Sequence, residues 1–263
     1  MSNSLKLDGQ KILITGVSRP LGIGATLTKR FLEAGAVLAI HGYSDYDMQM
    51  GYLDATESAT SHLAQALSNE NFKVVSLTSN DLSKKGVAVQ VISEANQKLG
   101  KIDGLILNHA YSTCALIGEW TEEHIDSHLL VNIRASMLMI QAFAEQVDVS
   151  KGGVVTLFTS GQYLGPMVNE IAYAVSKDAI IGLCKQVAVA LADKNIRINC
   201  VNPGPNDTGY MTGEAYEAVA KMFPSGRWGT PDDTADLLLF LHSEYAKWIT
   251  GQIIASEGGF RRI

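Results

Sequence analysis

Residues 11–35, KILITGVSRPLGIGATLTKRFLEAG, combine a short apolar run, a glycine-rich loop and a longer amphipathic run. The opening KILIT is apolar and rich in β-branched residues, which is typical of a buried strand. After the loop, apolar side chains recur at helical spacing until Gly35, which predicts a helix. Strand, glycine-rich turn and helix in this order are the setting of a dinucleotide-binding loop.

The three glycines of this loop have separate expected roles. Gly16 permits a tight turn directly after the strand, whereas Gly22 and Gly24 let the backbone approach a pyrophosphate at the start of the helix. Unpaired N–H groups and the helix dipole favour an anion there. The alternative is a plain turn between a strand and a helix, without a ligand.

The next strand is expected at 36–40, and it is followed by HGYS where a ribose-binding Asp or Glu is common. Asp45 and Asp47 come slightly later, in a long connection interpreted as a surface excursion. Without a carboxylate at this point a 2′-phosphate is not repelled, and Arg19 can pair with it. We therefore expect NADP(H) to be preferred over NAD(H), with Asp45 or Asp47 as the ribose ligand if NAD(H) is preferred instead.

The remaining pattern alternates strands and helices, which predicts an α/β fold with one doubly wound, Rossmann-like parallel sheet of about seven strands in three layers. No repeat or linker divides residues 1–263, so we expect a single domain, with a mobile substrate loop at about 205–226. Strands are expected at 72–77, 103–107, 152–160, 196–201 and within 251–259, and helices at 55–69, 84–98, 122–147, 172–193 and from Pro231.

The run SGQYLGPMVNEIAYAVSK, from Ser160 to Lys177, contains the candidate chemistry. Ser160 is expected at the end of a buried strand. Tyr173 and Lys177 are four residues apart on the next helix, so their side chains share a face. An ammonium beside a phenol favours the phenolate and lowers the pKa of the tyrosine, which suits a general acid or base. The alternative is a solvated pair on the helix surface.

Composition excludes several classes of function. The net charge of −6 and the pI near 5.5 argue against a nucleic-acid or anionic-membrane surface. No apolar run approaches the length of a membrane span, and the polar start MSNSLKLDGQ does not resemble a signal peptide, so we expect a cytoplasmic protein. Cys114, Cys184 and Cys200 lack metal-ligand spacing and are expected as reduced thiols in or near the core, with no metal site.

Taken in order, the motifs resemble the short-chain dehydrogenase/reductase family, in particular its β-ketoacyl-carrier-protein reductases, over nearly the whole chain. An asparagine within the long helix, Asn132, is one of them, and in a helix it needs either solvent or a buried polar role. The matching pieces are TGVSRPLGIG, Asp81-Leu82, NHA at 108–110, Asn132, Ser160, YAVSK, NPG at 202–204 with Thr208, and GRWGTPDD.

The resemblance implies a hydride-transfer site acting on a carbonyl/alcohol pair. Tyr173 would exchange the proton with the substrate oxygen, and Ser160 would hydrogen-bond the same oxygen. Lys177 would hold the nicotinamide ribose, and Asn132 would fix a water for proton relay. The implied cofactor-binding residues are Gly16, Ser18, Arg19, Gly22, Ile23, Gly24, Asp81, Leu82, Asn108, Ala110, Tyr173, Lys177, Pro203, Gly204 and Thr208. Asp81 can also cap the following helix.

Two departures from the family pattern concern the site. Five residues separate Gly16 from Gly22 where the common pattern has three; this is similar to divergent enoyl reductases, which however place Tyr and Lys farther apart. His109 and Tyr111 replace the usual Asn and Gly, so Tyr111 either shapes the substrate pocket or fills a neighbouring gap. Further candidates for the pocket of a small carbonyl or alcohol substrate are Gln162, Tyr163, Met167, Tyr210 and Met211.

The sequence leaves three functions open. The first is an NAD(P)-dependent reductase of carbonyl groups, similar to 3-oxoacyl-thioester reductases. The second is a reductase of carbon–carbon double bonds on the same scaffold, and the third is a dinucleotide-binding sensor with little turnover. The resemblance also implies a homotetramer formed through the helices at 122–147 and 172–193.

Overall fold

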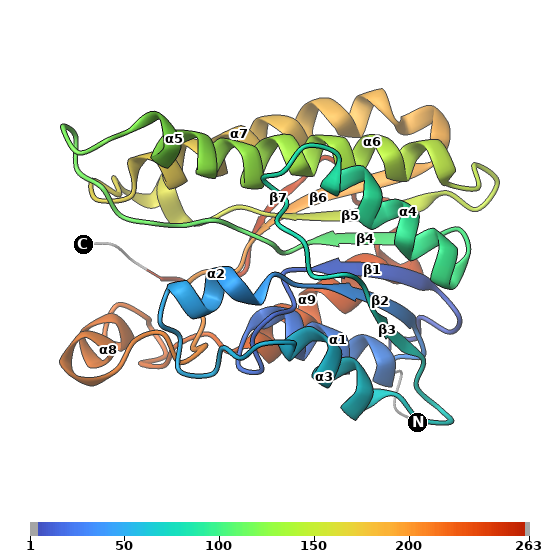
Figure 1. Cartoon of the computed structure of the whole chain (residues 1–263), viewed down its shortest axis with the longest axis horizontal. Helices are drawn as coiled ribbons and strands as arrows, with labels where there is room; N and C mark the ends of the chain where they lie inside the picture. Colours follow the sequence, from blue (N-terminus) through green and yellow to red (C-terminus); the bar gives the residue numbers. More distant parts are fainter. Residues whose placement is uncertain (1–4, 261–263) are drawn as a thin grey trace.

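In the computed structural model, which describes residues 5–260, seven parallel strands form one sheet in the order β3-β2-β1-β4-β5-β6-β7. Figure 1 shows three layers, with the sheet between two layers of helices. The expected α/β fold is confirmed. The strands are β1 Lys11–Thr15, β2 Val37–His41, β3 Val74–Ser76, β4 Gly104–Leu107, β5 Gly153–Phe158, β6 Ile196–Asn202 and β7 Ile253–Ala255.

One face of the sheet is covered by α4, α6 and α7, and the other by α1, α3 and α9 (Figure 1). Side chains alternate along a strand, so Leu13 packs into the first layer while Ile12 and Ile14 pack into the second. The helices are α1 Ile23–Glu33, α2 Ser44–Gln49, α3 Ala59–Leu67, α4 Val87–Leu99, α5 Glu122–His128, α6 Ser136–Gln146, α7 Ile171–Ala190, α8 Gly213–Ala220 and α9 Pro231–His242.

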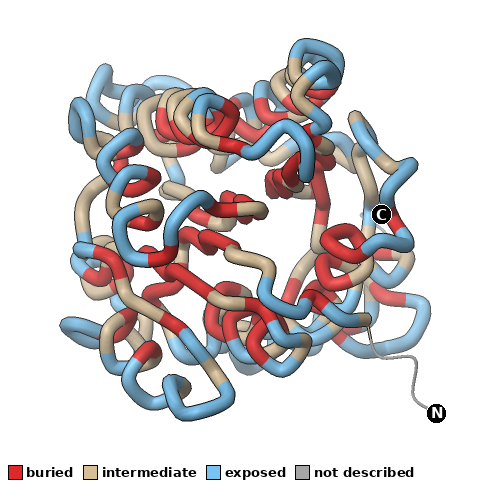
Figure 2. Tube along the Cα trace, turned by 90° about the vertical axis from the view of Figure 1, so that its right-hand side faces the viewer, coloured by how far each residue is buried: buried red, intermediate tan, exposed pale blue. Residues whose placement is uncertain are grey.

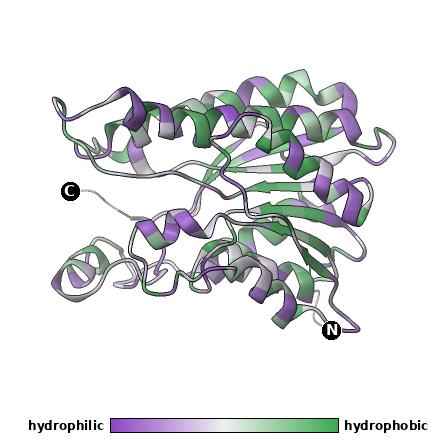
Figure 3. Cartoon of the chain, viewed as in Figure 1, coloured by the Kyte–Doolittle hydropathy of each residue, from purple (hydrophilic) through white to green (hydrophobic). Residues whose placement is uncertain are grey.

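Burial follows this layering. Buried residues line the strands and the inner faces of the helices, and exposed residues lie on the outer turns (Figure 2). The strands are also the most continuous hydrophobic segments (Figure 3), as expected for a parallel sheet covered on both faces. In the described part of the chain, no helix combines the length and apolarity needed to cross a bilayer.

Three local expectations differ from the structure. The long helix expected at 122–147 contains a π-helical stretch, Leu129–Ala135, between α5 and α6. The connection after β2, interpreted as a surface excursion, contains α2, and its Asp47 is buried. The substrate loop at 205–226 contains α8, whose Ala220 packs with Trp228 in a small apolar cluster.

The cysteines also differ in part from expectation. Cys184 and Cys200 are buried free thiols, as expected, but Cys114 is exposed in the segment after β4. Its position four residues beyond Ala110 lies outside the strand, where the chain leaves the core.

Candidate active site

The site residues expected from the sequence follow the carboxyl ends of four neighbouring strands. The glycine loop follows β1, the NHA segment follows β4, Ser160 follows β5 and the NPG segment ends β6. Because all the strands are parallel, these ends meet at one edge of the sheet, where α/β proteins bind ligands. The topology therefore brings together segments nearly 190 residues apart: a guanidinium nitrogen of Arg19 donates to the carbonyl oxygen of Thr208 at 2.6 Å.

Tyr173 and Lys177 share the inner face of the first turns of α7. Lys177 is only 4% exposed, and its Nζ donates to the carbonyl oxygen of Phe158 at 3.0 Å. The same Nζ lies 5.5 Å from the centre of the Tyr173 ring. The Ser160 hydroxyl is hydrogen-bonded to the Tyr173 phenol. The solvated surface pair is therefore wrong: the pair faces the carboxyl edge of the sheet.

Burial dominates the pKa values of this pair. Desolvation raises the pKa of Tyr173 to about 12, and the hydrogen bond from Ser160 opposes the rise. Desolvation also lowers the pKa of Lys177 to about 8. The expectation that the ammonium lowers the pKa of the phenol is wrong here, because Lys177 donates to the backbone of β5 and burial penalises the phenolate. Tyr173 is thus protonated at neutral pH and can act as an acid.

Asn132 has the buried polar role that its helical position required. Its Oδ1 accepts from the backbone N–H of Tyr111 at 2.7 Å, and its Nδ2 donates to the backbone oxygen of Tyr111 and to Ser176 Oγ at 3.0 and 2.8 Å. The π-helical stretch presents this amide between the segment after β4 and helix α7. Asn132 therefore holds the segment that contains Tyr111 in a defined position against helix α7.

The glycine loop fits the approach of a phosphate group. Gly16 has a φ of +70°, and a Cβ there would lie 2.7 Å from the backbone nitrogen of His109. A Cβ on Gly24 would lie 2.5 Å from Gly16 oxygen, while Asn108 Nδ2 donates to that oxygen at 2.9 Å. Helix α1 starts at Ile23, and its first hydrogen bond at this end runs from Ala25 N–H to the carbonyl oxygen of Gly22, so the N–H groups of Ile23 and Gly24 come before the first intrahelical acceptor. These groups can hold the phosphates of a dinucleotide.

Two carboxylates contact the glycine loop: Asp47, which the sequence offered as a ribose ligand, and Asp54, which the sequence reasoning missed. Ser18 donates to Asp47 Oδ2, and Arg19 Nε donates to Asp54 Oδ1 at 2.8 Å. Arg19, which was expected to be available to a 2′-phosphate, is instead paired with Asp54. The error has a structural reason: the connection of 42–58 folds back over the glycine loop instead of projecting outward. The signal in the sequence was the density of acidic and aromatic residues in SDYDMQMGYLD.

The remaining candidates for cofactor contacts have diverse surroundings. Asp81 accepts from the N–H and hydroxyl of Ser83 at 2.8 and 2.7 Å, so it caps the turn that leads to α4. Leu82 is buried in the core, at 5% exposure. Gly204 has a φ of +65° and packs against Glu257. Ala110 and Pro203 are half-buried at the ends of their strands, and Thr208 contributes its carbonyl oxygen to Arg19.

Tyr111 lies against other aromatic rings beside the catalytic candidates. Its ring centre is 5.1 Å from that of Tyr46 in α2 and 4.9 Å from that of His128 in α5. The Tyr46 hydroxyl accepts from the backbone nitrogen of Ser112 and donates to its oxygen, both at 2.9 Å. Tyr111 therefore joins α2 to α5, and the sequence analysis did not single out its neighbour Tyr46.

The other substrate candidates separate into two groups. Tyr210 is exposed, and its ring packs against that of Trp228. Its hydroxyl lies within electrostatic range of the Tyr173 phenol. The amide nitrogen Nε2 of Gln162 donates to Thr159 Oγ1 and to Asp178 Oδ1 at 3.0 and 2.8 Å. Its amide nitrogen is therefore engaged by the protein, and its contact with a substrate stays a prediction.

Tyr163 and Met211 are also engaged by the protein itself. The hydroxyl of Tyr163 accepts from Asn202 Nδ2 at 2.9 Å, although 47% of the residue is exposed. Met211 packs against the apolar cluster around Phe223 and Trp228, as a core residue would. The contact of Tyr163 and Met211 with a substrate stays a prediction.

His109 is a buried structural residue. Its Nδ1 lies 2.7 Å from Thr15 Oγ1 and its Nε2 lies 3.5 Å from Ser136 Oγ. Desolvation lowers the pKa of His109 to about 3, so the ring is neutral at physiological pH. The residue ties the end of β1 to the start of α6.

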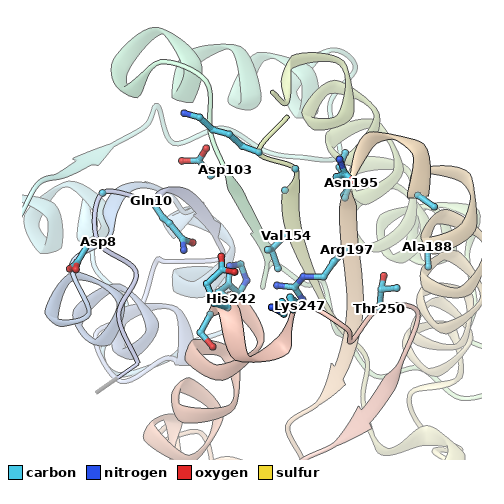
Figure 4. Close-up of a pocket in the computed structure, with 18 residues that line it drawn as sticks. Asp8, Gln10, Asp103, Val154, Ala188, Asn195, Arg197, His242, Lys247 and Thr250 are labelled. Carbon is cyan, nitrogen blue, oxygen red and sulfur yellow. The ribbon is translucent and has the colours of Figure 1, made fainter. Parts of the chain in front are cut away.

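A cavity of about 620 Å³ lies at the opposite edge of the sheet, near the amino ends of β1, β4, β5 and β6. Asp103, Arg197, His242 and Lys247 are among its lining residues (Figure 4). None of the candidate catalytic residues lines this cavity. Its side chains carry charges of both signs, and Arg197 already donates to the carbonyl oxygens of Leu241 and Ile249. Within residues 5–260 no group of three potential ligands suited to a metal ion occurs.

The sheet order and the glycine-rich loop after β1 define a Rossmann-like α/β protein of the dinucleotide-binding class. Comparison with known proteins then identifies the family. The family model described as Enoyl-(Acyl carrier protein) reductase matches residues 16–261. The chain belongs to the short-chain dehydrogenase/reductase family and is an oxidoreductase of that family.

Relatives of this family match over almost their full length. Uncharacterized oxidoreductase YjdA of Bacillus subtilis is 35% identical over 252 residues, which cover 95% of this chain and 96% of that protein. The 3-oxoacyl-acyl-carrier-protein reductase FabG of Thermotoga maritima is 31% identical over 260 residues, covering 97% and 99%. Among solved structures, a blue fluorescent protein from a metagenomic library in complex with NADPH has a TM-score of 0.86 at 26% identity, covering 98% of this chain and all of that chain.

Proposed function

We propose that this protein reduces a carbonyl group to an alcohol with a nicotinamide dinucleotide, and that Tyr173 supplies the proton. The observation that carries the proposal is the convergence of Ser160, Tyr173 and Lys177 at the carboxyl edge of the sheet, the edge at which the glycine loop also lies. The similarity to the 3-oxoacyl reductase of Thermotoga maritima supports a 3-oxoacyl thioester as the first substrate to test.

The residues of the site divide the reaction between them. The cofactor would supply the hydride that reaches the carbonyl carbon, and the electron pair of the carbonyl π bond then moves to oxygen. Tyr173, which is protonated at neutral pH, donates the phenolic proton to that oxygen. Ser160 donates a hydrogen bond to the same oxygen as negative charge develops. Lys177, whose Nζ is anchored on the carbonyl oxygen of Phe158, would hold the nicotinamide ribose.

The variant Tyr173→Phe tests the assignment of the acid. General acid catalysis contributes roughly 10²–10⁴-fold, so we expect a loss of this order in NADPH-dependent reduction, with NADPH binding retained in a fluorescence titration. Tyr245→Phe, which removes a hydroxyl from a tyrosine that is 67% exposed, is the matched control. Unchanged turnover by Tyr173→Phe would contradict the assignment, and a wild type without turnover on any carbonyl would favour a dinucleotide-binding sensor.

A second reaction is supported by the description of the matching family model, which names an enoyl reductase. Reduction of an enoyl thioester by the wild type at a rate above that of the corresponding 3-oxoacyl thioester would favour it. The four-residue spacing of Tyr173 and Lys177 supports carbonyl reduction instead, since the sequence resembles 3-oxoacyl reductases in this motif.

For the cofactor, the assembly and the location we propose the following. NADP(H) is the preferred cofactor, which the NADPH complex of the structural neighbour supports. The protein is a cytoplasmic homotetramer, supported by exposed apolar side chains on α6 and α7, among them Met137, Val175 and Val189. Light scattering coupled to size-exclusion chromatography tests the assembly, and a monomeric mass at micromolar concentration would contradict it.

A further inference from the structure

We propose that Asp54 selects the cofactor: its carboxylate occupies the groups of the glycine loop that would hold a 2′-phosphate, and so weakens NADP(H) binding relative to NAD(H). This inference rests on the function proposed above, because it concerns the cofactor of that reaction. The wild type should therefore prefer NADP(H) over NAD(H) less strongly than it would if Asp54 did not pair with Arg19.

The contacts of Asp54 resemble those of a bound phosphate. Its Oδ1 accepts from Arg19 Nε at 2.8 Å, and its Oδ2 accepts from the backbone N–H of Leu21 at 2.9 Å. A guanidinium and a backbone N–H beside a helix start are the donors with which proteins hold phosphate groups. The side chains of Arg19 and Asp54 are 11% and 13% exposed, so salt screens their attraction only weakly.

A second carboxylate reinforces this negative charge. Asp47 accepts from the hydroxyl of Ser18, and both residues are buried. Burial raises the pKa of Asp47, whereas the Ser18 hydrogen bond and the charge of Arg19 act in the opposite direction. A ribose 2′-hydroxyl can donate to a carboxylate, but a 2′-phosphate has no proton to offer at neutral pH and is repelled. The surroundings of Ser18 and Arg19 thus discriminate between the two cofactors.

The segment of 42–58 is held firmly enough to keep Asp54 in place. A Cβ on Gly42 would lie 2.4 Å from the backbone oxygen of Val17, so the segment starts in close contact with the glycine loop. After the segment, Thr60 Oγ1 donates to the same oxygen at 2.6 Å. The position of the Asp54 carboxylate is therefore fixed by the backbone contacts of this segment as well as by the ion pair with Arg19.

Arg19 keeps its position when the charge of Asp54 is removed. Its guanidinium carbon lies 3.8 Å from the centre of the Tyr52 ring, and another of its nitrogens donates to Thr208 oxygen. A neutral residue at 54 therefore leaves a positioned guanidinium without its counter-charge. Such a group attracts a phosphate more strongly than the paired one does.

The variant Asp54→Asn tests the inference with ligands that lack nicotinamide. Adenosine 2′,5′-bisphosphate and 5′-AMP are titrated by calorimetry, and NADPH and NADH by fluorescence. We expect the affinity of Asp54→Asn for the bisphosphate to rise roughly tenfold while the affinity for AMP changes less than about twofold. Glu57→Gln is the matched control, because it removes the same charge from an exposed position of the same segment. Arg19→Gln in the Asp54→Asn background should abolish the gain.

Two results would overturn the inference. Equal changes in the affinities for adenosine 2′,5′-bisphosphate and 5′-AMP would mean that Asp54 does not discriminate between the two cofactors. A lower affinity of Asp54→Asn for the bisphosphate would mean that Asp54 orients Arg19 for phosphate binding. Asp54→Ser repeats the test if Asp54→Asn lowers the urea midpoint. Absence of turnover with both cofactors bound would refute the proposed reaction alone, whereas absence of nucleotide binding in every variant would refute both proposals.

Discussion

Replacement of Lys177 by methionine should stabilise the protein while it abolishes turnover. Lys177 is 4% exposed, and burial lowers the pKa of its ammonium from 10.5 to about 8. When folding lowers the pKa of a lysine, its charged form is less stable in the folded state than in the unfolded chain, so the charge destabilises the fold. Methionine has a similar length, no charge and a flexible side chain that can fill the same space.

The size of the effect follows from the pKa values. The difference between 10.5 and about 8 is worth about 3 kcal/mol of unfolding free energy at pH 7. Loss of the hydrogen bond from Nζ to the carbonyl oxygen of Phe158 costs about 1 kcal/mol. The net expectation for Lys177→Met is therefore a gain of about 2 kcal/mol at pH 7.

The pH dependence has a definite sign. Between about pH 8 and pH 10.5 the lysine is neutral in the folded state and charged in the unfolded state. The unfolded state then binds more protons, so the stability of the wild type rises with pH in this window relative to the variant. The destabilising effect of the charge is complete below about pH 8 and falls to about 1 kcal/mol at pH 9.5.

Urea denaturation of both proteins at pH 7 and pH 9.5, followed by tryptophan fluorescence, measures these differences. Lys185→Met changes an exposed lysine on the same helix and should leave stability within about 0.5 kcal/mol. The reasoning is refuted if Lys177→Met is less stable than the wild type at pH 7, or if the difference between them does not shrink as pH rises. Simultaneous loss of turnover would show that the buried charge is kept for function.

Three further outcomes are expected. Gly24→Ala places a Cβ 2.5 Å from Gly16 oxygen, so it should lower the unfolding free energy by about 1–3 kcal/mol and weaken AMP binding. A urea midpoint and a calorimetric AMP affinity equal to those of the wild type would contradict the close packing. Thr230→Ala removes a capping box with Asp233 and should cost about 1 kcal/mol, measured by the urea midpoint. The absorbance at 295 nm of wild type minus Tyr173→Phe should show no phenolate below about pH 11, because burial raises the pKa of Tyr173 to about 12; a transition near pH 9 would contradict this.

Most elements of the fold follow from local patterns. The strands at β1, β4, β5 and β6 are short apolar runs, and the helix over 171–190 has apolar residues at helical spacing. The pairing of Tyr173 with Lys177 on one face needs only the geometry of a helix. The π-helical stretch around Asn132 was not predictable in this way, because it depends on hydrogen bonds to Tyr111 and Ser176, which are distant in the sequence.

The segment after β2 shows the limit of sequence reasoning at the site itself. Its acidic residues were visible, but their partners, Ser18 and Arg19, precede them by about 30 residues and contact them only after the segment folds back. The direction of the pKa shift of Tyr173 was equally inaccessible. It depends on how much water the surrounding elements exclude, which no spacing of residues reports.

Periodicity and motif order were thus sufficient for most of the elements, for the parallel sheet and for the segments that meet at its carboxyl edge. These properties are short-range, because each depends on neighbouring side chains and on the direction of the strands. The charge state of Tyr173 and Lys177, and the occupation of Arg19 by Asp54, were decided by the tertiary structure. Desolvation and ion pairing depend on which distant groups share a buried space, and only the folded chain brings those groups together.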